Sequence, residues 1–81
     1  MAWEGLGGTI NPGQTVTWWY SWGGYHGVDV PSVRPLTPNA KLVCAHHGGR
    51  LEQNGNYTYF VDITNVSGFP ASYHLVGTSA A

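Results

Sequence analysis

The sequence predicts an all-β fold, a small antiparallel two-sheet β-sandwich of five to seven short strands. Two segments, Thr15–Trp22 and residues 56–66, show the apolar alternation of strands with one buried face. Gly, Pro and Asn residues separate the candidate strands, and no stretch has a 3.6-residue apolar period or a capped helix start. A chain of 81 residues has room for one core, so we expect a single β-sandwich domain over residues 1–81.

The segment Thr15–Trp22 reads TVTWWYSW and is rich in β-branched and aromatic residues. Adjacent residues of a strand point to opposite faces, so the alternation with Val16 and Tyr20 predicts Trp18 in the core and Trp19 outside. The turn sequence Asn-Pro-Gly at residues 11–13 predicts a short preceding strand at residues 8–10.

The longest candidate strand covers residues 56–66. The residues expected on its inner face are Tyr57, Tyr59, Val61 and Ile63. A turn at residues 67–70 leads to a returning strand at residues 72–77, with Tyr73 and Leu75 inward. A further strand is expected at residues 41–45.

Closely spaced glycines and prolines predict two loops. Residues 23–38 are expected to form a long loop with at most one short edge strand. Residues 46–55 are expected to form the second loop.

The composition excludes several classes of protein. Cys44 is the single cysteine, so no intrachain disulfide forms, and a metal, an oligomer or an aromatic-rich core must stabilise the fold instead. Aromatic residues, at 14% of the chain, are the main candidate. Charged residues make up 9% against roughly 25% in an average domain. The three basic residues, Arg34, Lys41 and Arg50, are too few for a phosphate-binding stripe, so we expect no nucleic-acid partner. A net charge of −1 with outward aromatics favours a homo-oligomer.

The hydropathy pattern predicts no membrane partner. No run approaches the roughly 18 apolar residues that span a bilayer, and the start of the chain lacks a basic n-region and an apolar h-region. We therefore expect neither a transmembrane segment nor a signal peptide in this chain, and the compartment stays open.

Two of the predicted strands resemble those of immunoglobulin-like sandwich domains. The family's second strand is similar to Gly13-x-x-Val16-x-Trp18-x-Tyr20, and its penultimate strand is similar to Leu51-x-Gln53-x-Gly55-x-Tyr57-x-Tyr59-x-Val61-x-Ile63-x-Asn65. Tyr20 and Tyr59 stand where the family has its paired cysteines, and Tyr57 matches the position of the tyrosine corner. The resemblance implies a Greek-key sandwich with an adhesive or binding role and no particular ligand.

An outward Trp19 followed by an aromatic, glycine-rich loop indicates a ligand platform. Trp19, Trp22 and Tyr25 offer flat rings for the apolar face of a sugar, while His26 and Asp29 offer polar groups for its hydroxyls. The main hypothesis is therefore a non-catalytic, lectin-like module that binds a neutral, hydroxyl-rich ligand, and we expect this ligand to be a carbohydrate. The alternatives are a structural, self-assembling subunit whose outward aromatics lie between copies, or a small protein inhibitor.

Neither a metal site nor an active site is predicted. Cys44 and His46 are expected on one strand face with His74 on another strand, but a structural zinc site needs four ligands and a copper site of the sandwich type needs an axial methionine. No paired carboxylate motif, nucleophile elbow or phosphate-binding loop is present. We expect no cofactor and no enzyme activity.

Overall fold

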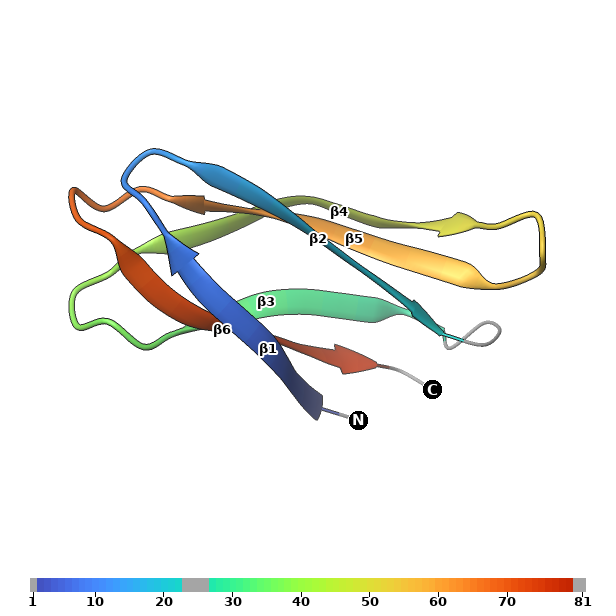
Figure 1. The fold of residues 1–81 in the computed structure, drawn as a ribbon. Coiled ribbons are helices and arrows are strands. Elements are labelled where there is room, and N and C mark those ends of the chain that lie inside the picture. The colour runs from blue at the N-terminus through green and yellow to red at the C-terminus, as the bar shows by residue number, and fades with distance from the viewer. Residues whose placement is uncertain (1, 23–26, 80–81) are drawn as a thin grey trace.

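The computed structural model describes residues 2–22 and 27–79, without the side chain of Trp22. They form two antiparallel three-stranded sheets that pack against each other as a β-sandwich, which confirms the predicted fold (Figure 1). The six strands are β1 (Ala2–Ile10), β2 (Thr15–Trp22), β3 (Asp29–Pro35), β4 (Leu42–Leu51), β5 (Tyr57–Asn65) and β6 (Ala71–Ser79). Within the described residues, no helix is long and apolar enough to cross a membrane.

The strand order is β1-β6-β3 in one sheet and β2-β5-β4 in the other. The two strands that resemble immunoglobulin strands, β2 and β5, therefore lie side by side, and Tyr20 is directly opposite Tyr59. In immunoglobulin domains the corresponding strands lie in facing sheets. The pairing of β2 with β5 is thus a difference from the family's arrangement, and the resemblance itself stays a prediction.

The core lies between the inner faces of β5 and β6, the central strands of the two sheets. Its buried residues are Ile10, Val61, Ile63, Tyr73 and Leu75. The predicted inner faces of β5 and β6 are thus confirmed. Trp18 and Tyr20 also point inward but stay half-buried, because β2 is an edge strand and one flank of its inner face remains open.

Strands β1 and β4 extend far beyond the bounds that the sequence predicted, and β6 extends slightly beyond its own. Residues 46–55 do not form a loop throughout, because β4 continues to Leu51 and pairs with β5 as far as Tyr57. The connecting turn is limited to residues 52–56, where Gly55 has a φ of +90°. The first strand begins at Ala2, paired with Thr78, rather than at residue 8. Both segments are rich in glycine, which has low β-propensity, so their strand structure depends on a partner strand that is distant in sequence.

A β-bulge in β4 changes which side chains share a face. The register shifts between Ala45 and Gly48, and His46 has a φ of +51°. Cys44 packs against the core, while His46 contacts Asp62 on the outer face. The prediction that Cys44 and His46 share a face is therefore wrong, because the extra residue of a bulge interrupts the two-residue alternation.

Candidate functional site

The five residues predicted to bind a ligand do not form one described cluster. Trp19 lies on the outer face of β2 with 70% of its surface exposed. Asp29 begins β3 and is only 8% exposed. The side chain of Trp22 and the whole of Tyr25 and His26 lie outside the described residues.

Asp29 and Trp19 lie on opposite sides of the β2-β5-β4 sheet. The Tyr20 hydroxyl donates a hydrogen bond to Asp29 Oδ1 at 3.1 Å. Tyr20 points inward and its ring stacks on Tyr59 at 5.7 Å. Burial, and then the Asp29 charge, raise the pKa of Tyr20 above its usual value. Asp29 therefore accepts a hydrogen bond inside the sandwich and does not lie beside Trp19.

The direct neighbour of Trp19 on the outer face is Phe60. The two residues are cross-strand partners in β2 and β5, and Gly48 of β4 is the next partner of Phe60. A Cβ atom at Gly48 would lie only 3.1 Å from Phe60 Cζ, so the glycine leaves room for the ring to extend over β4. Trp19 and Phe60, side by side across the sheet, are called the aromatic platform below.

A carboxylate with two partners lies beside this platform. Asp62 follows Phe60 by two residues and so shares its face. Thr17 Oγ1 donates to Asp62 Oδ1 at 2.6 Å, and His46 Nδ1 lies 3.2 Å from Asp62 Oδ2. The Thr17 hydrogen bond, and to a smaller extent the His46 ring, lower the pKa of Asp62. Asp62 therefore stays ionised at neutral pH and presents hydrogen-bond acceptors.

The charges on the other side of the platform are paired. Arg50 Nε donates to Glu52 Oε1 at 2.6 Å. This bond, and after it one from Thr58, lower the pKa of Glu52. The outer face of this sheet thus combines the exposed Trp19 and the half-buried Phe60 with polar groups and little unbalanced charge.

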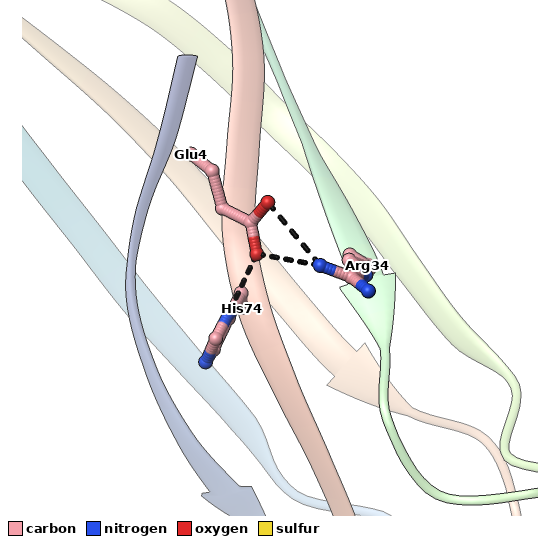
Figure 2. A network of polar contacts seen from close by, with 3 residues as sticks. All are labelled: Glu4, Arg34 and His74. Atoms are coloured by element: carbon pink, nitrogen blue, oxygen red, sulfur yellow. Dashed lines mark hydrogen bonds and ion pairs between the residues drawn. The ribbon is translucent and has the colours of Figure 1, made fainter.

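A second polar cluster lies on the other sheet and joins its three strands (Figure 2). Glu4 of β1 accepts a hydrogen bond from Arg34 of β3 at 3.0 Å, and its Oε2 lies 2.6 Å from His74 Nδ1 of β6. The His74 contact, and then Arg34, lower the pKa of Glu4. All three side chains are exposed by 41–60%, so this cluster joins β1 and β3 to β6 at the solvent-exposed surface of the sheet.

Three cavities in the described part of the molecule are lined by neither Trp19 nor Phe60. One, of about 610 Å³, is an open hollow over β6 lined partly by Glu4, Val30 and Val76. A second, about 430 Å³, lies between β3 and β4 and includes Asp29 and Tyr59. By size alone, the first hollow is the better candidate for a ligand site. A sugar ring that stacks on an aromatic side chain needs a flat surface rather than a cavity, so the chemistry of the aromatic platform suits such a ligand better.

The candidate metal ligands are not brought together. Cys44 is half-buried on an inner face, and burial raises the pKa of its thiol. His46 and His74 lie on outer faces of different sheets, each beside one carboxylate. Within residues 2–22 and 27–79, no group of three His, Cys, Asp or Glu side chains gathers in a metal-binding arrangement.

Four residues of this outer face were not among the predicted ligand-binding residues: Phe60, Asp62, Gly48 and His46. Alternation along β5 does place Phe60 and Asp62 on one outer face, and this signal was readable. The positions of Gly48 and His46 on this face could not be predicted from the sequence, because they depend on the β4 bulge and on the register between β4 and β5.

Comparison with protein-family models, with curated proteins and with solved structures finds no match for this chain.

Proposed function

We propose that the outer face of the β2-β5-β4 sheet binds a neutral, hydroxyl-rich ligand, and that this ligand is a carbohydrate. The observation that carries the proposal is the aromatic platform, in which Trp19 is 70% exposed beside its cross-strand partner Phe60. A large aromatic side chain buries apolar surface with little loss of conformational freedom, which makes it an effective binding residue. The backbone under both residues belongs to a paired sheet, so the platform is preformed.

The polar neighbours of the platform suit sugar hydroxyls. Asp62 is held in place by Thr17 and His46, and an ionised carboxylate accepts strong hydrogen bonds from hydroxyl groups. Arg50 and Glu52 neutralise each other on the far side. A face with so little net charge favours a neutral ligand over a phosphate and predicts binding that depends little on salt.

The experiment is a screen on a glycan array, followed by titration of the best ligand with Trp fluorescence as the signal. Trp19→Ala should weaken binding by at least about tenfold, roughly 1.4 kcal/mol. Phe60→Ala should weaken it by a similar factor, and Asp62→Asn by roughly threefold to tenfold. Circular dichroism of each variant checks that the fold is intact.

The matched control is Val30→Ala, which removes an apolar side chain that is 43% exposed on the outer face of the other sheet. It should leave glycan affinity unchanged. No binding to any glycan, or equal binding by wild-type protein and a folded Trp19→Ala variant, would contradict the proposal.

A further inference from the structure

The two sheets leave four edge strands, and three of these are protected from pairing with another chain. Unpaired N–H and C=O groups at a sheet edge recruit other strands unless bulges, prolines or charges prevent it. Strand β1 has a register shift between Glu4 and Gly7, and β4 has one between Ala45 and Gly48. Strand β3 carries two prolines and an arginine within seven residues.

Strand β2 has none of these protections. Its eight residues, TVTWWYSW, include no glycine, proline or charged residue, and its register with β5 is unbroken from Thr15 to Trp22. Among the described strands it pairs with β5 alone. A long, regular, uncharged edge of high β-propensity is the type of edge that pairs with another strand.

The hydrogen-bond register identifies which residues of β2 have free backbone groups. Asn65 N–H donates to the carbonyl of Gln14, so the even-numbered residues that follow direct their N–H and C=O groups toward β5. The odd-numbered residues direct theirs to the open edge. They are Thr15, Thr17, Trp19 and Ser21.

A second feature of the same flank is an apolar cleft between β1 and β2. Its volume is about 320 Å³, and Leu6 at its rim is 81% exposed. The other apolar side chains that line it are Trp3, Trp18, Tyr20 and Leu75. A strand added to the edge of β2 would extend beside this cleft and cover part of its apolar surface, which stabilises the pairing.

We propose that β2 pairs antiparallel with β2 of a second copy of this chain, joining two β2-β5-β4 sheets into one continuous sheet about a two-fold axis. The strand is complementary to itself, because the fullest pairing of the odd-numbered residues opposes Thr15 with Ser21 of the second copy and Thr17 with Trp19 of the second copy. Each such pair exchanges two backbone hydrogen bonds. β2 has no charged side chain, so no charges oppose each other across the paired strands. The net charge of −1 gives little repulsion between the two copies.

The pairing has a consequence for the outer surface. A two-fold axis perpendicular to the sheet keeps Trp19 of both copies on the same face. Two aromatic platforms then lie on one continuous surface, so a ligand with repeated units contacts both copies. This geometry increases the apparent affinity for a polymer over that for its monomer.

Thr17→Pro and Thr17→Val form a matched pair that tests the proposal. Both variants lose the hydroxyl that donates to Asp62, but only proline loses the N–H that faces the open edge. Proline is tolerated at an edge position whose N–H faces solvent. In sedimentation equilibrium, wild-type protein and Thr17→Val should form dimers of similar affinity, and Thr17→Pro should weaken the dimer by more than about tenfold. A wild-type monomer at concentrations near 1 mM, or a folded Thr17→Pro variant that dimerises as well as Thr17→Val, would overturn the proposal.

Amide hydrogen exchange of the wild-type protein keeps the test decisive if Thr17→Pro does not fold. Raising the protein concentration should slow exchange at Thr17, Trp19 and Ser21 by about tenfold or more, and should leave the edge amides of β3 unchanged. A dimer in which the β2 amides exchange as fast as in the monomer would place the interface elsewhere and overturn the proposal. Neither experiment uses a glycan, so their result is independent of the proposed ligand.

Discussion

Trp18 and Trp19 are adjacent in the sequence and lie on opposite faces of one sheet. Trp18 packs against the core, and its Nε1 donates a hydrogen bond to the hydroxyl of Tyr73 in the facing sheet. Trp19 points to solvent. One of these indoles therefore joins the two sheets, and the other is available to a ligand or to a neighbouring molecule.

Replacing each indole by alanine should separate these roles. Trp18→Ala removes core contacts and an inter-sheet hydrogen bond, so the free energy of unfolding should fall by about 3 kcal/mol. Trp19→Ala removes an exposed side chain and should change it by less than about 0.5 kcal/mol. Urea denaturation of both variants measures these values. Equal destabilisation by the two substitutions would mean that the faces are wrongly assigned.

The close approach of β1 to β6 depends on Gly7. A Cβ atom at Gly7 would overlap the backbone carbonyl oxygen of Tyr73, whereas one at Gly8 would meet nothing within 4 Å. Gly7→Ala should therefore cost more than about 2 kcal/mol of stability, and Gly8→Ala should stay within about 1 kcal/mol of wild type. Thermal or urea unfolding checks the difference, and a Gly7→Ala variant as stable as Gly8→Ala would contradict the close contact.

Much of this architecture was readable from alternation. The patterns along Thr15–Trp22 and in residues 56–66 predicted both inner faces and the outward position of Trp19. The two-residue alternation depends only on the geometry of one strand, so it can be recognised without knowing the partner strand.

The pairing of the strands and the position of the β4 bulge could not be predicted from the sequence. The neighbours of Trp19 depend on the register between β2 and β5, which is set by contacts distant in sequence. The position of His46 depends on a bulge that shifts a face by one residue. The burial of Asp29 depends on Tyr20, which lies on another strand. Two of the predicted ligand-binding residues, Trp19 and Asp29, therefore lie on opposite sides of the sheet.

The titration of Asp62 should report on its partners. Its pKa in the folded protein is lowered from the usual 3.8, first by the Thr17 hydroxyl and then by His46. A carboxyl group with a depressed pKa contributes stability that is fully present above the unfolded value, near pH 3.8, and is lost as the pH falls through the folded value. Glycan affinity should fall over the same acidic range, because the protonated carboxyl is a weaker acceptor.

An NMR titration of the Asp62 carboxyl carbon measures this effect. Thr17→Val should raise the pKa toward 3.8, and His46→Ala should raise it by less. Glu52, whose partners are Arg50 and Thr58, serves as the internal control and should titrate unchanged in both variants. A larger effect from His46→Ala than from Thr17→Val would show that the order of the two interactions is wrong.

The most direct test of the binding proposal is to map chemical-shift changes during titration with the best neutral glycan from the array. We expect changes centred on the Trp19 indole N–H and on the amides of Phe60 and Asp62, with no change at Val30 or Val76 on the outer face of the other sheet. Changes confined to residues 22–29, or centred on the cavity beside Asp29, while the Trp19 indole resonance stays in place, would contradict it.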